Sequence, residues 1–554
     1  MRKLLPSLGS PAAKVLAFIG RHPTPILVLP SLWFLARYLP FWKDIDATVQ
    51  LIASAYDDNL LHFPPLYSFL GRVPFFVIDS ILSGHAPGIF ERQHPSLAAV
   101  YGLVVLQHVG LWLALRYFVF SFPARDIARG CVTLLLASIA SFYAFAHTCG
   151  SEAMTPVAYF LVFGAGIRVL LSRATWTSWV IYTAALFLAA GSRHINLILL
   201  IWLPGTVVLL WLWSFLPPRL ARRLVRRSQR SRVEPADLSG EVGSLRACPS
   251  KLPEFQTTGR SRESETTGRS LAITALMAFL CTLAAFGADK IVLSTLCHRF
   301  GVIERSSLGS AMSGRIGTWV DKLSPERKRA LLDSVQRLTN DPLVKLAIQF
   351  QIEIGSYDKG TGEALTDALK ARGFAGEKLW ALKDQLISQS SFCFYRTLDF
   401  GLMKEIFSDF WHGFLPTNDQ GIAIAAPKAT FFSLERINQN PSDWEGIKES
   451  PIFVPSTAKA TLERAITDNM IRHWRWLPIL VWTLVFLGFG SWRAARGFLP
   501  GRYLFVGLTI LGIGTLVYAA NCVCIYTLPR YALPLLVAVI AFGCLISAGS
   551  SADK

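Results

Sequence analysis

Long apolar stretches recur along the chain and are separated by short polar loops and by two longer polar segments. A helix needs about 20 mostly apolar residues to cross the hydrocarbon core of a bilayer. The pattern predicts about ten such helices, because Arg193 and His194 divide one long stretch into two. They cover residues 25–41, 96–120, 127–145, 154–171, 176–216 (two helices), 271–293, 476–492, 503–525 and 531–547. A buried helix of a soluble core could mimic one of them but not all, so we expect an all-α polytopic membrane protein.

Composition and charge agree with this expectation. The 554 residues are 52% hydrophobic and 17% charged, whereas soluble chains average roughly 25% charged. Lys and Arg outnumber Asp and Glu by 55 to 37. Together these values exclude a disordered chain, a disulfide-stabilised miniprotein and a typical soluble nucleic-acid-binding protein. The basic short loops fall on one side, which the positive-inside rule assigns to the cytoplasm. We expect a multi-pass protein of a bacterial inner (plasma) membrane with both termini in the cytoplasm.

Two polar segments define the domain organisation. Residues 217–270 carry 12 Lys/Arg against 6 Asp/Glu and are rich in Ser, Thr, Gly and Pro, which predicts a basic, disordered cytoplasmic insertion. Its start resembles an amphipathic helix on anionic lipid, so we expect membrane lipids and no nucleic acid as partners. Residues 294–473 are nearly neutral and predict a mostly helical extracytoplasmic domain, in which Ser324-Pro325 and Asp341-Pro342 begin helices. The remaining parts are the N-terminal membrane module 1–216 with its first outer loop 42–95, one helix at 271–293 and the C-terminal helices of 474–554.

The nine cysteines predict no disulfide framework, and none of them forms a CxxC pair with zinc-ligand spacing. Cys297 and Cys393 share the outer domain and could pair in an oxidising compartment. The preferred interpretation is that they are unpaired small apolar residues.

The first outer loop holds the main candidates for chemistry. Asp44 and Asp46 follow the first apolar stretch, and Asp46 is placed to cap a short helix over residues 47–56 on the membrane surface. The alternative is that Asp46 is only a helix cap and Asp44 only a solvated flanking residue.

The order of features resembles the GT-C superfamily of membrane glycosyltransferases. A span is followed by acidic residues, by a short surface helix and by His62-Phe63-Pro64-Pro65-Leu66-Tyr67. The likeness is to the branch of protein O-mannosyltransferases and lipid A aminoarabinose transferases, whose HPPLY-like motif here has Phe63 inserted. Three further motifs fit that branch and bring the likeness to residues 20–215 and 475–550: Glu152 in the second outer loop, Arg193 between the fifth and sixth spans, and Arg530-Tyr531-Ala532-Leu533-Pro534 before the last span.

This resemblance implies a GT-C-like bundle and an inverting hexosyl- or pentosyltransferase active on the extracytoplasmic face. Such an enzyme moves a sugar from a polyprenyl-phosphate donor to a hydroxyl of a lipid, glycan or protein acceptor. It needs one general base, for which Asp44 is the first candidate and Asp46 the second, because Ile45 separates the two acids.

The resemblance also implies roles for other residues. Glu152 would orient the acceptor or support the base, and Arg193 and Arg530 would bind the donor phosphate. For each arginine the alternative is a snorkelling or topology-setting role. The remaining substrate-binding candidates are His62, Tyr67, His194 and Tyr531. No cofactor is assigned. A divalent metal on His62 stays an alternative to a phosphate contact or a structural histidine.

Two other functions fit a chain of this kind. One is a transporter or flippase of a lipid-linked substrate, which the hydropathy disfavours because it shows no inverted repeat and no paired broken helices. The other is a non-catalytic scaffold of a surface-polysaccharide assembly complex.

Overall fold

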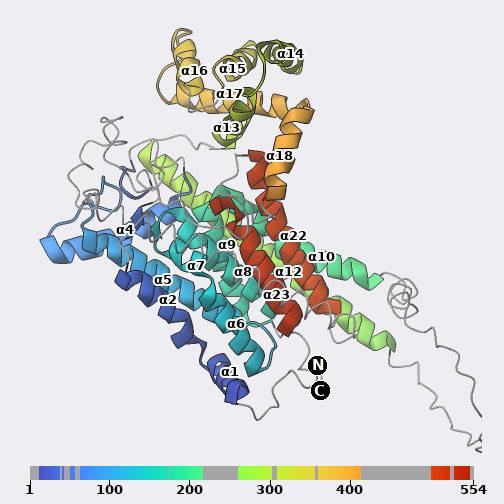
Figure 1. The fold of residues 1–554 in the computed structure, drawn as a ribbon. Coiled ribbons are helices and arrows are strands. Elements are labelled where there is room, and N and C mark those ends of the chain that lie inside the picture. Colours follow the sequence, from blue (N-terminus) through green and yellow to red (C-terminus); the bar gives the residue numbers. More distant parts are fainter. Residues whose placement is uncertain are drawn as a thin grey trace, which may run out of the picture. The chain divides into compact units, whose positions relative to one another are not determined.

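The protein is mostly helical in the computed structural model (Figure 1), which describes residues 11–37, 40–42, 50–55, 63–172, 174–215, 260–301, 308–355, 360–412, 501–524 and 529–548. The chain divides into two compact units, one of residues 1–200 with 281–554 and one of residues 201–280. The second unit contains α10 and the first part of α12.

The described helices lie in both halves of the chain. The N-terminal half has α1 (Pro11–Arg21), α2 (Pro23–Arg37), α4 (Pro65–Ser83), α5 (Leu97–Val119), α6 (Asp126–Ser138), α7 (Ala140–Ala146), η2 (Ser151–Ala153), α8 (Met154–Leu171), α9 (Trp176–Ser192), η3 (His194–Ile201) and α10 (Trp202–Phe215). The C-terminal half has α12 (Arg260–Phe300), α13 (Leu308–Val320), α14 (Pro325–Gln336), α15 (Pro342–Glu353), α16 (Thr361–Lys370), α17 (Gly376–Arg396), α18 (Phe400–His412), α22 (Gly501–Cys524), η8 (Pro529–Ala532) and α23 (Leu533–Ala548).

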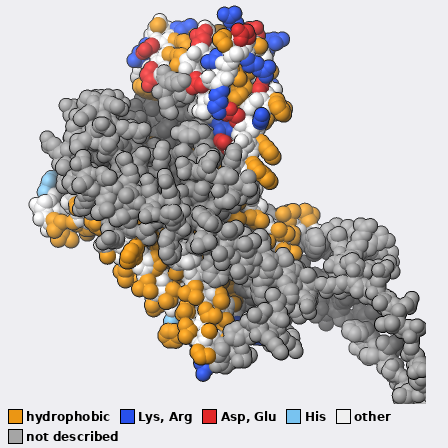
Figure 2. Space-filling view, in the orientation of Figure 1, with side chains coloured by type: hydrophobic (Ala, Val, Ile, Leu, Met, Phe, Trp, Pro, Cys, Tyr) orange, Lys and Arg blue, Asp and Glu red, His pale blue; other side chains and the backbone are white. Residues whose placement is uncertain are grey.

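Six helices within the described ranges are long and apolar enough to cross a membrane, and bent pairs raise this number to eight at most. This is the pattern of a helical multi-pass membrane protein. Hydrophobic side chains cover the outer faces of α2 and α5 (Figure 2), as contact with lipid requires. The expected number of about ten is not confirmed, and one expected span, 476–492, lies outside the described residues. The expected break at Arg193 is confirmed, because α9 ends there and η3 begins.

Two spans are bent, which the hydropathy pattern did not predict. The α1–α2 pair bends by 79° at His22, and the α6–α7 pair bends by 58° at Ile139. At the first bend, Pro23 disfavours helical backbone in the residue before it. The α1–α6 contact depends on two glycines: a Cβ on Gly20 would lie 1.8 Å from the Asp126 carbonyl oxygen, and one on Gly130 would lie 2.0 Å from that of Leu16. The hydropathy showed no paired broken helices, whereas these two bent pairs lie among the described residues.

Helix α4 was expected to be part of the first outer loop, yet it has the length and composition of a span. Arg72 and Pro74 interrupt its apolar pattern in the sequence. In the structure the Arg72 side chain is fully buried and its guanidinium donates to the carbonyl oxygens of Ile89 and Gln50, both at 3.1 Å, and of Ala53 at 2.5 Å. The charge is therefore solvated by backbone dipoles from two loops, which makes its burial tolerable.

The helices of the N-terminal bundle pack around α8. In α8, 78% of the most apolar window is buried, more than in any other candidate span of the described residues. Helices α5 and α9 lie beside it (Figure 1). Ser96 and Thr175 cap α5 and α9 through their hydroxyl groups. At the C-terminal end, α22 packs against α23, and both contact α8.

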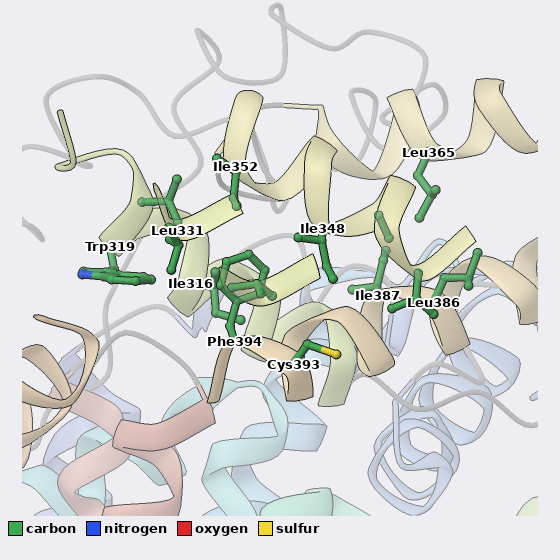
Figure 3. Close-up of a cluster of buried hydrophobic side chains, with 14 of the residues drawn as sticks. Ile316, Trp319, Leu331, Ile348, Ile352, Leu365, Leu386, Ile387, Cys393 and Phe394 are labelled. Atoms are coloured by element: carbon green, nitrogen blue, oxygen red, sulfur yellow. The ribbon is translucent and has the colours of Figure 1, made fainter. Parts of the chain in front are cut away.

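Helices α13–α18 share a hydrophobic core of their own (Figure 3), which Ile316, Ile348, Leu386 and Phe394 fill from three different helices. We call these helices the outer helical domain, after the position expected for residues 294–473. Two predicted helix starts are confirmed: Ser324 accepts from the Arg327 amide, and Asp341 accepts from the amides of Leu343 and Val344. The described part of the domain ends at His412.

The structure describes the start of α12 and the two cysteines predicted to be unpaired. Helix α12 begins at Arg260, so its first turns lie in the segment predicted to be a disordered insertion. The thiols of Cys297 and Cys393 are both free, which agrees with the preferred interpretation.

Candidate functional site

A short parallel β-bridge connects the loop that follows α2 with the loop that follows α7. Phe41 and Trp42 of β1 (Phe41–Trp42) pair with Thr148 and Cys149 of β2 (Thr148–Cys149). Asp44 follows Trp42 by two residues in the sequence, and Glu152 follows Cys149 by three. The bridge therefore brings together the starts of the two segments that carry the predicted acids. Asp44, Asp46 and His62 lie outside the described residues, as does the side chain of Arg530.

The loop that carries β2 is held by a buried hydrogen-bond network. Gln107 of α5 donates through Nε2 to the carbonyl oxygens of Ala146 at 2.9 Å and Thr148 at 3.0 Å. Its Oε1 accepts from the Tyr67 hydroxyl at 3.0 Å, and that hydroxyl accepts from the Gly150 amide at 2.7 Å. Both contacts of Tyr67 are with protein groups, so Tyr67 positions the loop. We call Gln107 and Tyr67 the loop clamp.

A second pair of polar side chains lies under the same loop. His108 and His147 are fully buried, with His108 Nε2 at 3.2 Å from His147 Nδ1. His108 Nδ1 lies 3.1 Å from the Ser31 hydroxyl. This chain of contacts joins α2, α5 and the residue that precedes β2, so it reinforces the position of the loop.

Three of the predicted site residues, Glu152, Arg193 and Tyr531, lie close together in the structure. Glu152 in η2 is buried at 2% exposure, and its Oε1 lies 3.6 Å from Arg193 Nη1. On another side the Arg193 guanidinium carbon lies 5.2 Å from the centre of the Tyr531 ring in η8, which is a cation–π distance. The structure thus assembles Glu152, Arg193 and Tyr531, from regions far apart in the sequence, around one guanidinium group.

The backbone at Arg193 explains how that side chain is presented. Arg193 ends α9 in an extended conformation, with φ −155° and ψ 128°. Asn196 fixes the break: its Nδ2 donates to the Ala189 carbonyl oxygen at 3.0 Å, and its Oδ1 accepts from the Tyr159 hydroxyl at 3.1 Å. His194, another predicted binding residue, begins η3 and is half-buried.

Asp289, which lies beside Gly191 in the structure, was not predicted from the sequence as a site residue. Asp289 lies in the candidate span of α12 and is 7% exposed. Its Oδ1 would be 3.4 Å from a Cβ built on Gly191, two residues before Arg193. A carboxylate inside an apolar span is costly, and this was the signal available in the sequence.

Chemically, the arrangement offers a buried carboxylate, a cation held against it and an aromatic face. Arg193 keeps 20% of its side chain exposed, and a guanidinium has several N–H donors, so one ion pair leaves capacity for an anion. Within the described ranges, no group of three His, Cys, Asp or Glu side chains is arranged to hold a metal ion. Comparison with protein-family models, curated proteins and solved structures finds no match to this chain.

Proposed function

We propose that this chain is a membrane glycosyltransferase of the GT-C type. It transfers a sugar from a polyprenyl-phosphate-linked donor to an acceptor hydroxyl on the extracytoplasmic face. The observation that carries the proposal is the β1–β2 bridge. It brings the segment leading to Asp44 and Asp46 beside the segment leading to Glu152, which is itself paired with Arg193.

Covalent geometry supports placing Asp44 at this site. Two residues of extended chain span at most about 7 Å, so Asp44 stays near Trp42 and the bridge. A carboxylate near the reacting atoms is required because the attacking hydroxyl must lose its proton. Loop residues positioned by a rigid scaffold are common carriers of such chemistry, and the loop clamp supplies the rigidity here.

The proposed reaction is a single displacement at the anomeric carbon. The acceptor oxygen forms a bond to that carbon while its proton passes to the carboxylate of Asp44 or Asp46. The bond from the anomeric carbon to the phosphate oxygen breaks, and its electron pair leaves with the lipid phosphate. Arg193 stabilises the negative charge of that phosphate, Glu152 fixes the guanidinium, and Tyr531 covers its face.

The test is transfer of labelled sugar from a polyprenyl-phosphate donor by the full chain in nanodiscs. We expect the double variant D44N/D46N to lose at least about 100-fold in rate, as removal of a general base predicts. The variant D58N, in the same loop, is the matched control and should keep the rate. Unchanged transfer by the double variant at normal abundance would refute the proposal.

One alternative has a structural observation in its favour. The two bent helix pairs resemble the discontinuous helices of transporters. A transporter or flippase would move the lipid-linked substrate across a liposome membrane without forming product. Labelled lipid is measured on both leaflets of liposomes that have the same lipid composition as the nanodiscs. Movement of the lipid without product would indicate a transporter, and formation of product would indicate an enzyme.

A further inference from the structure

The exposed apolar side chains of the outer helical domain are concentrated in one place. Among the described residues 308–412, five large hydrophobic side chains are exposed, and all lie between residues 392 and 411. They are Phe392 at 51%, Leu398 at 72%, Phe400 at 81%, Phe407 at 64% and Trp411 at 53%. The upper part of Figure 2, over α14–α16, instead mixes basic and acidic side chains.

Three of these side chains form a line along α18. At 3.6 residues per turn, Phe400, Phe407 and Trp411 point within about 40° of one another, and exposed Lys404 lies at the edge of that sector. We call this line the aromatic stripe. The opposite face of α18 is buried, since Leu402 is fully covered by the domain core. A surface helix normally exposes polar side chains on its outer face, so α18 departs from the usual pattern.

The stripe lies at the end of a candidate span. The Tyr518 hydroxyl of α22 donates to the Asp409 carbonyl oxygen at 2.9 Å, and the rings of Tyr518 and Phe410 are 6.0 Å apart. The Tyr395 hydroxyl donates to the Val523 carbonyl oxygen. A part-buried ion pair, Arg315 Nη1 to Asp409 Oδ2 at 2.5 Å, connects α13 to α18. The orientation of α18 against α22 is therefore set by several independent contacts.

These contacts also set the depth of α18 relative to the membrane. Tyr518 is six residues before the end of α22 at Cys524, which is about 9 Å at 1.5 Å per residue. The 24 residues of α22 are about 36 Å long and exceed a hydrocarbon core of about 30 Å by a few ångströms at each end. The end of α18 that contacts Tyr518, at Asp409 and Phe410, therefore lies about 6 Å inside the boundary between hydrocarbon and headgroups.

We propose that the aromatic stripe of α18 is a membrane-binding surface that inserts into the bilayer interface beside α22. Aromatic rings, and Trp above all, are enriched at this depth, and Lys404 can extend its ammonium group to lipid headgroups. Figure 1 shows α18 running along the direction of α22, so the C-terminal end of the stripe, with Phe407 and Trp411, reaches deepest toward the lipid. Such an attachment holds the outer helical domain to the membrane surface, where a lipid-linked donor would lie.

The experiment measures the surroundings of the stripe directly and needs no enzymatic activity. A nitroxide is attached to Phe407→Cys, to Phe400→Cys and to the control Ala330→Cys on the exposed surface of α14, each in the full chain in phosphatidylcholine/phosphatidylglycerol nanodiscs. Unsubstituted protein treated with the same reagent corrects for native thiols. Power saturation then compares collisions with oxygen, which concentrates in lipid, and with a water-soluble nickel chelate.

We expect the labels at positions 407 and 400 to favour oxygen at least several-fold over the control at position 330. Two outcomes would overturn the proposal. Nickel accessibility equal to that at position 330 would place the stripe in water, and protection from both reagents would mean that protein covers it. All three replaced side chains are exposed, so misfolding is not expected, and size-exclusion chromatography of each variant checks this. Position 400 repeats the test if the variant at 407 does not fold.

Discussion

Removing the loop clamp should loosen the segment that carries Glu152. In Gln107→Leu the side chain keeps a similar volume but loses its hydrogen bonds to the carbonyl oxygens of Ala146 and Thr148. Gln107 is fully buried, so both carbonyl groups lose a partner away from water. Each such group costs about 1–3 kcal/mol, which gives about 2–6 kcal/mol for the two.

This cost should appear as local opening of the loop and can be read from Cys149. The Cys149 thiol is fully buried, and burial raises its pKa, so it reacts slowly with an alkylating reagent while the loop is closed. A loss of at least 2 kcal/mol in the opening free energy raises the reactive population by about 30-fold, because 1.4 kcal/mol is a factor of ten. Peptide-resolved mass spectrometry of alkylation measures that rate at Cys149 against buried Cys544 in α23.

A matched variant distinguishes loop opening from general destabilisation. Gln351 is also fully buried, but it donates to Ser313 and Ser391 inside the outer helical domain. Gln351→Leu should leave the Cys149 rate unchanged, and Gln107→Leu should leave the Cys544 rate unchanged. Equal Cys149 rates in Gln107→Leu and in the unsubstituted protein would refute the assignment of Gln107 as a clamp.

Three further predictions follow from single groups. Hydrogen bonds that the Glu326 carboxylate accepts from its own backbone amide and from the Ser324 hydroxyl hold the pKa of Glu326 below its ordinary value of 4.5. Its contribution to stability is therefore present above pH 4.5 and is lost as the pH falls through the lowered value, and Glu326→Gln should flatten the acid limb of a urea-unfolding series. Arg193→Ala should lose about 3–5 kcal/mol of unfolding free energy because it leaves the buried Glu152 carboxylate without its cation, whereas Arg193→Lys should be milder and chiefly raise KM for the donor. Gly20→Val should block the α1–α6 contact and lower Tm in detergent, while exposed Val15→Ala should not.

The parts of the fold that the sequence predicted are those set by local pattern. Uninterrupted apolar stretches predicted α5 and α8, and the cap residues Ser324 and Asp341 marked helix starts, because capping depends on neighbours within a turn. Helix α4 escaped prediction for the opposite reason. Its Arg72 is tolerated only because carbonyl groups from residues 50–53 and 89–91 surround it, and those contacts are not local in the sequence.

In the candidate site, too, the sequence predicted some residues and could not predict others. Glu152, Arg193 and Tyr531 were each chosen singly from motifs, yet their meeting depends on how α8, α9 and η8 pack. Gln107 could not be predicted as part of the site from the sequence, because a glutamine inside an apolar helix has many structural explanations. Asp289 carried one, the cost of a carboxylate in a span, but its neighbour Gly191 lies about a hundred residues away in the sequence.

We propose that this chain consumes a lipid-linked sugar through Asp44 and Asp46. The most direct test is mass spectrometry of polyprenyl-phosphate sugars in cells that lack the chain. Such cells should accumulate the donor, the unsubstituted gene should return it to the normal level, and a gene carrying D44A and D46A should not, although its product is present in the membrane at normal abundance. An unchanged donor level in the deleted cells would refute the proposal that this chain consumes the donor. A normal donor level restored by the double variant would refute the role of Asp44 and Asp46.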